Sequence, residues 1–499
     1  MPQMSKLIRS RDEWRKKAVQ RAEQVRELRK AKRRYQDRIA ELKTQINELE
    51  ETGKKNDAML IEQADSSAHP PVTDLSQAGQ SRVLCILLII QGVVSYRSVP
   101  RILDLFYAAT GLTTARVPHF TSVINWVLRL GLGLLRQVKP MTQPWLAIID
   151  HSIDVGTKKA LVVLRVPMKV LSQKDGAVQL QDCECIGLHI SDTVNGDSVA
   201  SELTDIFCKS GAPSAIIKDC DSTLNKGVNL WKENRGLDVP VIEDISHVMA
   251  AALKKQFENT DNYQKFTTLV SNGAKNLRQT ALSFLTPPKL RTKGRFLSIG
   301  RLGLWGAKML DVLDSDSEKE ENNENIPDKL RAAFPDIGEV KPFIRHFAHT
   351  ADVVSQVMEK LKNNGLNRVV FRQCRRLAKT LPEESEVRQR LLQWLERHID
   401  IRKQITRFSL PVSSDIIESL FGRFKYMSER NPQADMNRSV LLIPALCGNL
   451  NDTVIKQALD NAPHGELKKW EEENIPYTMR KKRREFFNGV NPKTGEEVT

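Results

Sequence analysis

Two short apolar runs in this chain end in an aspartate. The run WLAIID ends at Asp150, and the run SAIIKD ends at Asp219. Both are apolar enough to be strands buried inside a sheet. A carboxylate buried alone is energetically costly, and two carboxylates side by side repel each other and tend to retain a proton. A divalent cation between them removes both costs, and hard oxygen ligands suit Mg²⁺ or Mn²⁺. The two runs therefore predict a metal site at neighbouring strand ends.

A third carboxylate is expected from the segment LPVSSDIIESLFGRFK. This segment has the pattern of a helix that Ser413 or Ser414 caps. Glu418 lies one residue from the apolar stripe, and Lys425 lies two turns further along the same polar flank. We expect Glu418 to complete the metal site from across the strand ends. The apolar stripe consists of Ile417, Leu420, Phe421 and Phe424.

Other acids compete for two of these positions. Asp221 follows Asp219 by two residues, but it opens the next predicted helix, where a carboxylate is suited to capping. Asp219 is favoured because it ends the apolar strand. Asp415 and Glu429 are the alternatives to Glu418.

Two histidines lie near these acids in the sequence. His247 follows the predicted strand VPVIED, and it is equally compatible with a contact to a substrate strand and with a core histidine held by its own helix. His151 adjoins Asp150, but neighbouring residues on a strand point to opposite faces, so His151 is the weaker candidate for a site residue.

The elements that must position these residues follow from hydrophobic periodicity. Apolar alternation predicts strands, with Asp175-Gly176 as a hairpin turn between the second and the third, and periods near four predict the helices. The resulting order, β-β-β-α-β-α-β-α, is an antiparallel meander continued by two right-handed crossovers. The predicted strands are 145–149, 159–168, 178–190, 214–219 and 239–244, and the predicted helices are 197–209, 224–231 and one from 245.

A helical unit precedes the predicted sheet. One helix holds the run 83–90, a second starts at Ser95 and ends before Gly111, and a third starts near Pro118-His119. The third helix has an apolar face and a polar face, which is the pattern of a helix-turn-helix DNA reader, although an ordinary helical subdomain is equally compatible with it. The polar residues expected to contact bases are Ser122, Asn125 and Arg129.

The remaining segments complete the predicted domain organisation. A heptad pattern over six repeats predicts an N-terminal coiled coil, and an acidic stretch at 314–325 predicts a solvated loop. The predicted parts are a coiled coil (1–56), a linker (57–79), a helical DNA-binding domain (80–138), the first part of the core (139–258), a helical insertion (259–409), the final core helix (410–435) and a helical C-terminal region with a basic tail (436–499).

Composition restricts the class of protein. The chain has 499 residues, a formal net charge of +15 and a pI of about 9.4, which favours a polyanionic partner such as nucleic acid. The longest apolar run is too short to span a bilayer, and no secretory signal is expected, so we predict a cytoplasmic location, nucleoid-associated in a bacterium or nuclear in a eukaryote. The 7 cysteines lack zinc-ligand spacing and are expected to be reduced, buried thiols.

The ordered set of motifs resembles the DDE transposases and integrases, in particular the bacterial insertion-sequence type with a helical insertion before the Glu. KDCDSTLNKG resembles the segment around the second Asp of this family, and VPVIEDISHVMA resembles the strand and helix that follow it. SSDIIESLFGRFK resembles the last helix, in which six residues separate the Glu from a Lys. VSYRSVPRIL and HFTSVINWVLRLG are similar to the family's end-binding helices. The resemblance covers about residues 80–250 and 410–430.

Two features depart from the family pattern. Some relatives place Tyr and Arg upstream of the Glu, where this chain has Pro411 and Ser414. The segment from Asp219 to Glu418 is 199 residues long (418 minus 219), which implies an all-helical insertion domain.

The resemblance implies a ribonuclease H-like α/β core, with a mixed five-stranded sheet and helices, next to all-α N-terminal and insertion domains. It implies two Mg²⁺ ions, or Mn²⁺ in their place, held by Asp150, Asp219 and Glu418, and a phosphate held by Lys425. The implied activity is cleavage of transposon ends and their transfer to target DNA. Residues expected to contact DNA are Ser122, Asn125, Arg129, His247, Lys289, Arg291, Lys293, Arg295, Arg423 and Lys425.

The expected partners are DNA, both transposon ends and target, and further copies of the chain in a homodimer or larger oligomer, with no membrane. Two other functions compete with transposition. One is a nuclease of the same fold that only hydrolyses DNA. The other is a DNA-binding protein descended from a transposase, without catalysis.

Overall fold

The computed structural model describes residues 77–111, 117–155, 158–174, 177–191, 194–278, 280–289, 296, 299–314, 326–428, 437–475, 483–484 and 487. Every element below belongs to one compact unit, Ser76–Thr499. Several predictions lie outside the described residues: the coiled coil at 1–56, the turn at Asp175-Gly176, most of the acidic loop, and the residues Arg291, Lys293, Arg295 and Glu429.

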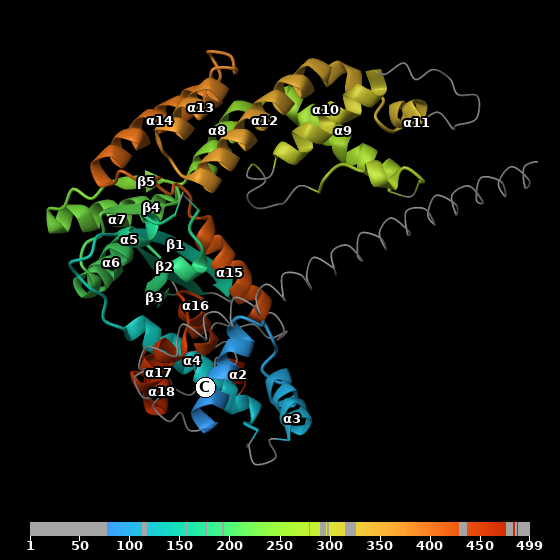
Figure 1. The fold of residues 1–499 in the computed structure, drawn as a ribbon. Helices are drawn as coiled ribbons and strands as arrows, with labels where there is room; N and C mark the ends of the chain where they lie inside the picture. Colours follow the sequence, from blue (N-terminus) through green and yellow to red (C-terminus); the bar gives the residue numbers. More distant parts are fainter. Residues whose placement is uncertain are drawn as a thin grey trace, which may run out of the picture. The chain divides into compact units, whose positions relative to one another are not determined.

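Five strands form one mixed sheet in the order β3-β2-β1-β4-β5 (Figure 1). β2 is antiparallel to both β1 and β3, whereas β4 is parallel to β1 and β5 is parallel to β4. This topology agrees with the predicted strand order and is compatible with a ribonuclease H-like core. The strands are β1 (Trp145–Val155), β2 (Lys158–Pro167), β3 (Glu184–Ser191), β4 (Ala215–Lys218) and β5 (Val241–Glu243).

Helices make up most of the remaining described chain. A run of them, from α9 to α14, lies in the sequence between α8 and α15, where the helical insertion was predicted. The longer helices are α2 (Gln77–Ile90), α3 (Ser98–Thr110), α4 (Phe120–Arg136), α6 (Gly196–Ser210), α7 (Ser222–Arg235), α8 (Ile245–Phe257), α9 (Asp261–Leu277), α10 (Gly300–Asp314), α11 (Ile326–Ala333), α12 (Lys341–Asn364), α13 (Arg368–Ala378), α14 (Glu386–Ile405), α15 (Asp415–Ser428), α17 (Asp452–Asp460) and α18 (His464–Asn474). The four-residue helices are α5 (Met168–Leu171) and α16 (Leu442–Ala445).

The central strand β1 is buried on both faces. Leu146 and Ile148 point into one apolar cluster, and Ala147 and Ile149 point into a second one. The second cluster is closed by α6 and α7, and the first contains apolar residues of α8 and α15. Helices on both faces explain why β1 has no polar residue before Asp150.

α4 is the helix against which the N- and C-terminal helices pack. It contacts α2 and α3 on the one hand and α16, α17 and α18 on the other. A Cβ atom on Gly131 would meet the carbonyl oxygen of Leu441 at 1.8 Å, and one on Gly133 would meet that of Ala458 at 1.9 Å. Glycine at both positions therefore permits contact between backbones, and the described parts of 80–138 and 436–499 share one core.

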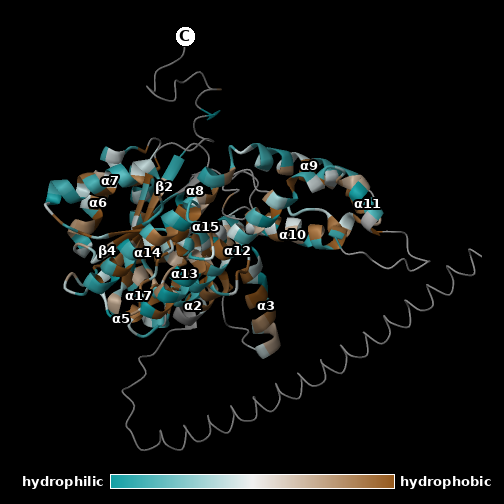
Figure 2. Cartoon of the chain, turned by 90° about the horizontal axis from the view of Figure 1, so that it is seen from above, coloured by the Kyte–Doolittle hydropathy of each residue, from teal (hydrophilic) through white to brown (hydrophobic). Residues whose placement is uncertain are grey.

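α3 exposes apolar side chains to solvent. Ile102, Leu105 and Phe106 are 39%, 71% and 49% exposed, and the helix is coloured as hydrophobic in Figure 2. Its opposite side buries Val99 and Leu103. Within the described part of the chain, none of the helices combines the length and the apolar composition that a membrane span requires.

The first and third strands differ from the prediction. β1 continues to Val155 instead of ending at residue 149, because its second half still pairs with β2, so Asp150 lies inside the strand. β3 begins at Glu184 rather than at residue 178, because Leu180–Asp182 form a turn of 3-10 helix in which the side chains of Gln179 and Asp182 cap each other's backbone. The expected hairpin between the second and third strands is wrong, since the connection is longer and also contains α5.

Two predicted helix starts, and the predicted burial of two cysteines, also differ from the structure. α2 begins at Gln77, inside the predicted linker, and α3 begins at Ser98, whose amide donates to Ser95 Oγ at 3.2 Å. All 7 cysteines are unpaired, but Cys208 and Cys220 are exposed rather than buried. Both lie beyond the strands of the core, on α6 and in the turn after β4.

Candidate active site

Asp150 and Asp219 lie side by side on two parallel strands. Asp150 lies inside β1, which continues to Val155, and Asp219 directly follows the end of β4. Ile149 of β1 pairs with Lys218 of β4, so the next residue on each strand is one of the two acids. Burial, and then the charge of Asp219, raises the pKa of Asp150 to about 7. Burial also raises the pKa of Asp219, although a hydrogen bond from the Asp221 amide to its Oδ1 at 3.0 Å acts in the opposite direction. The structure thus brings together the first two predicted carboxylates.

Asp221 has a different task from Asp219. Its Oδ1 accepts hydrogen bonds from the amides of Thr223 and Leu224 at 2.8 and 3.1 Å, which caps α7. A capping carboxylate is already occupied by backbone donors. The preference for Asp219 over Asp221 as a site residue therefore has a structural basis.

Lys218 supports the turn that carries Asp219. Its ammonium is buried and donates to the carbonyl oxygen of Asp219 at 3.1 Å and to the side-chain oxygen of Asn225 on α7. Burial lowers the pKa of Lys218. The lysine holds the end of β4 against α7 from the face of the sheet that the acids do not occupy.

Glu418 approaches the two aspartates from α15. It is exposed, and its Oε1 lies 3.6 Å from Nε2 of His247 on α8. The interaction with Glu418 raises the pKa of His247 to about 9, and the same interaction lowers the pKa of Glu418. At neutral pH this is an imidazolium facing a carboxylate. The charge of Glu418 also acts on Asp150 and raises its pKa, which places the third predicted acid near the first.

Asp244 joins the two helices that carry His247 and Glu418. Its side chain is fully buried at the end of β5. One oxygen accepts from the amides of Ser246 and His247 at 2.6 and 3.2 Å and so caps α8. The other accepts from the Ser414 amide and hydroxyl at 2.5 and 2.8 Å and from the Ser413 hydroxyl at 3.1 Å, at the start of α15.

This role of Asp244 was missed by the sequence reasoning. Two signals were present: an acid at a strand end three residues before His247, and the pair Ser413-Ser414 directly before the last helix. The serines were predicted to cap α15 themselves. Ser413 Oγ does accept from the Asp415 amide at 3.2 Å, but both serines also donate to Asp244.

His151 faces away from the acids, as alternation on a strand requires. Its Nε2 is buried without a hydrogen-bond partner, and burial lowers its pKa to about 4. The ring is therefore neutral at pH 7. It belongs to the opposite face of the sheet rather than to the carboxylate site.

The residues fit a divalent cation in their chemistry, though they are not gathered around one point. Asp150 and Asp219 are adjacent carboxylates whose repulsion a cation would relieve. Glu418 instead faces His247. Among the described residues, which include all three acids, no group of three or more His, Cys, Asp or Glu is close enough to hold a metal ion.

The polar face of α4 is used inside the molecule. Arg129 donates from Nε to the carbonyl of Ala462 at 2.6 Å and from Nη2 to that of Leu459 at 2.7 Å. Asn125 is half-buried, and its side-chain oxygen has no partner. Ser122 is half-buried as well. These contacts attach α4 to the end of α17 and do not favour base reading by Arg129, which stays a prediction.

The other predicted DNA contacts separate into two groups. Lys425 and Lys289 are exposed, on α15 and in the loop after α9 respectively. Arg423 is half-buried, and its Nη2 donates to the carbonyl of Ile90 at the end of α2. Arg423 therefore connects α15 to α2, which is a structural contact.

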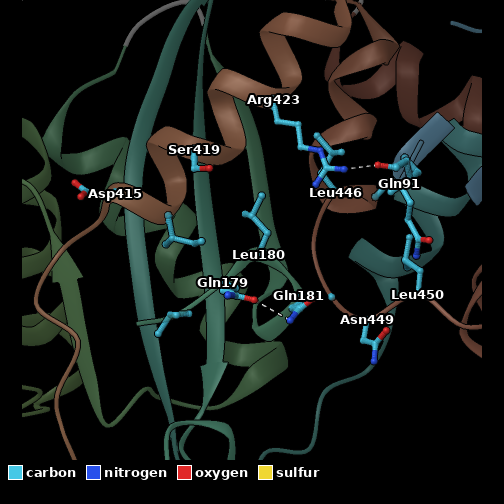
Figure 3. Close-up of a pocket in the computed structure, with 15 residues that line it drawn as sticks. Gln91, Gln179, Leu180, Gln181, Asp415, Ser419, Arg423, Leu446, Asn449 and Leu450 are labelled. Carbon is cyan, nitrogen blue, oxygen red and sulfur yellow. Dashed lines mark hydrogen bonds between the residues drawn. The ribbon is translucent and has the colours of Figure 1, made fainter. Parts of the chain in front are cut away.

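A cavity of about 550 Å³ lies on another side of α15. Asp415, Ser419 and Arg423 of α15 line it together with residues of the 3-10 turn and of the loop after α16 (Figure 3). None of the three acids Asp150, Asp219 and Glu418 lines it. The cavity is thus separate from the carboxylate site.

Comparisons with known proteins find a distant structural likeness and no relative by sequence. No family model matches the chain, and no curated protein matches it. Among solved structures, the chain is similar to the Drosophila P element transposase strand transfer complex, with 11% sequence identity and a TM-score of 0.38. The match covers 81% of this chain and 99% of the other. A likeness this distant transfers no residue role.

Proposed function

We propose that this protein is a metal-dependent DNA-cleaving and strand-transferring enzyme of the DDE transposase type. The observation that carries the proposal is the pair Asp150 and Asp219, one inside β1 and the other directly after the adjacent β4, with Glu418 near enough to act on Asp150 electrostatically. Burying two acids side by side costs stability, so a chain retains them where they have a task.

Asp150, Asp219 and Glu418 would hold the divalent cations, Mg²⁺ or Mn²⁺. Bound cations of this kind supply a Lewis acid for a phosphodiester and lower the pKa of a water molecule. The chain's own groups prepare the site. Burial, and then the neighbouring Asp219, raises the pKa of the Asp150 carboxyl to about 7, and His247 keeps Glu418 ionised. Exposed Lys425, two turns along α15 from Glu418, would hold a phosphate in this proposal.

The substrates in this proposal are DNA ends and target DNA, and the acting species is a homodimer or larger oligomer. The basic charge of the chain supports a nucleic acid partner. The heptads at 1–56 support self-association.

An assay of strand transfer separates this function from its two competitors. Full-length protein is incubated with Mg²⁺, a labelled duplex carrying the inverted repeats that flank its gene, and a plasmid target. Joined products support the transposase. Cleavage without joining supports a nuclease of the same fold. Binding without either reaction supports a non-catalytic DNA-binding protein. Asp150→Asn serves as the negative control, because activity that survives it comes from a contaminant or from another site.

A further inference from the structure

α13 carries a row of exposed cations on one side. The helix RVVFRQCRRLA contains no acidic residue, and it buries Val370, Cys374 and Ala378, which are four residues apart. Residues three and four apart share a side of a helix, so the cations of α13 gather on the side opposite this buried stripe. The basic face of α13 consists of Arg368, Arg372, Arg375, Arg376 and Lys379, all of them exposed.

Acids neutralise little of the basic face. Arg375 lies 4.0 Å from Glu396 with both side chains about half exposed, and such pairs contribute about 0–1 kcal/mol. Arg372 donates from Nε to the carbonyl of Arg368, which is not a charge partner. Within the described part of the chain, no ion pair involves Arg368, Arg372, Arg376 or Lys379.

The neighbouring helix α14 is basic too, but three of its arginines are paired with acids. Arg388 lies 3.0 Å from Glu383, and Arg390 and Arg397 lie 3.7 and 3.3 Å from Glu243, next to Asp244. α14 and α13 are in contact and are seen together in orange in Figure 1. These three arginines of α14 thus have acids facing them, whereas on the basic face of α13 only Arg375 has one, at 4.0 Å.

A groove of about 960 Å³ continues the basic face at the start of α13. No acidic and no aromatic residue lines it. Arg402 is held there by the carbonyls of Arg407 and Phe408 rather than by a carboxylate. Burial, and then the charge of Arg368, lowers the pKa of Arg402. The basic lining residues are Arg368, Arg402, Lys403 and Arg407, of which Lys403 pairs with Asp400 at 2.7 Å.

The chain ties this groove to the helix that carries Glu418. Leu366, two residues before Arg368, exchanges two backbone hydrogen bonds with Leu410, at 2.7 and 3.0 Å. Lys362 of α12 lies 2.5 Å from Asp415, in the first turn of α15. The start of the basic face is therefore attached to the segment that leads into α15.

We propose that the basic face of α13 and this groove form a binding surface for the sugar-phosphate backbone of double-stranded DNA. This inference rests on the proposed function for the presence of a DNA substrate. From Arg368 to Lys379 the helix rises about 16 Å at 1.5 Å per residue, which matches roughly five phosphates of one strand at 3.4 Å each. Single-strand binding uses aromatic side chains on which bases stack, and the groove has none.

The test compares two charge-matched triple variants of the full-length protein. Arg372→Ala, Arg376→Ala and Lys379→Ala are combined to remove three unpaired cations of the basic face. Lys209→Ala, Lys456→Ala and Lys469→Ala are combined as the control, since these lie on α6, α17 and α18 and have no ion pair among the described residues. Affinity for a labelled duplex of scrambled sequence is measured across a salt titration. Thermal unfolding checks that both variants are folded.

The surface variant is expected to bind the scrambled duplex about 10-fold or more weakly at moderate salt, with a salt slope reduced by about 2.7, at about 0.9 per phosphate contact. The control is expected to keep the slope of the wild-type protein. Equal losses in both variants, or none in either, overturn the assignment of this surface. A loss on duplex RNA but not on duplex DNA also overturns it, because the occupant is then RNA.

Failure of this surface and failure of the proposed function give different results. If the wild-type protein binds and joins DNA and the surface variant binds DNA equally well, only the assignment of the DNA-binding surface is refuted. If the wild-type protein binds DNA but neither cleaves nor joins it, and the surface variant loses this binding, the surface is supported and the proposed enzymatic function is refuted. Wild-type protein that binds no DNA refutes both.

Discussion

The carboxylate site and the basic face of α13 hold their charges in opposite ways. Asp244 is fully buried, and Asp150 and Asp219 are half-buried, with pKa values that burial raises. The cations of the basic face are exposed and mostly unpaired. A buried charge costs several kcal/mol unless something offsets it, so each one has to be explained by a partner or a ligand. An exposed charge costs little, and only its clustering indicates a partner.

The largest expected effect separates the acids of the site from the acid that caps a helix. Asp150→Asn, Asp219→Asn or Glu418→Gln should each lower DNA cleavage and joining about 1000-fold or more, because each loses a cation ligand, while DNA affinity stays near that of the wild-type protein. Asp221→Asn is the matched control two residues from Asp219 and should retain activity. Cleavage rates measure the activity of each variant, and binding isotherms measure its DNA affinity. Near-normal turnover in any of the three variants would remove that residue from the site.

The next effect concerns stability. Asp244→Ala should lower the free energy of unfolding by about 3–5 kcal/mol, because several buried donors lose their acceptor. Asp221→Ala removes only the α7 cap and should cost about 1 kcal/mol. Chemical denaturation of the two variants gives the comparison. Equal losses would mean that Asp244 is an ordinary cap and does not join α8 to α15.

Asp150 should show a pH dependence of the opposite sign to that of a stabilising carboxylate. Its folded pKa of about 7 lies above the unfolded value of 3.8, so the folded state binds the extra proton and stability falls as pH rises from about 4 to 7. Asp150→Asn should therefore stabilise the metal-free protein at pH 8 by up to about 4 kcal/mol and leave it nearly unchanged at pH 4. Thermal unfolding at the two pH values tests this. A destabilised variant at pH 8 would show that the carboxylate is well paired.

The smallest expected effect contrasts two arginines. Arg129→Ala should cost about 1–2 kcal/mol of stability, because two carbonyls at the end of α17 lose their donor. Arg372→Ala, in the basic face, should change stability by less than about 0.5 kcal/mol. Chemical denaturation of the two variants measures both changes in the free energy of unfolding. If Arg129→Ala leaves stability unchanged but relaxes base preference on DNA, α4 reads bases after all.

Strand positions were predicted well because the signals for them are local. Buried strands such as WLAIID and SAIIKD are short apolar runs, and the starts of both were placed within a residue. The end of the first was wrong, because β1 continues as far as Val155 while it pairs with β2. The β3 start was misplaced because the stretch from residue 178 has partly alternating polarity, while Gln179 and Asp182 favour a turn through side-chain caps. The buried stripe of α15 matched its predicted apolar residues for the same local reason.

The sequence by itself determined that two acids follow short apolar strand runs and that a third lies on a late amphipathic helix, because periods of two and of 3.6 residues are visible in any chain. Only the tertiary structure decided which polar residues are used internally. Asp244 meets Ser414 across 170 residues of chain, and Arg129 meets Ala462 across 333. A hydrogen bond between such distant residues depends on how helices and sheet pack, and a single sequence carries no periodicity that reports it.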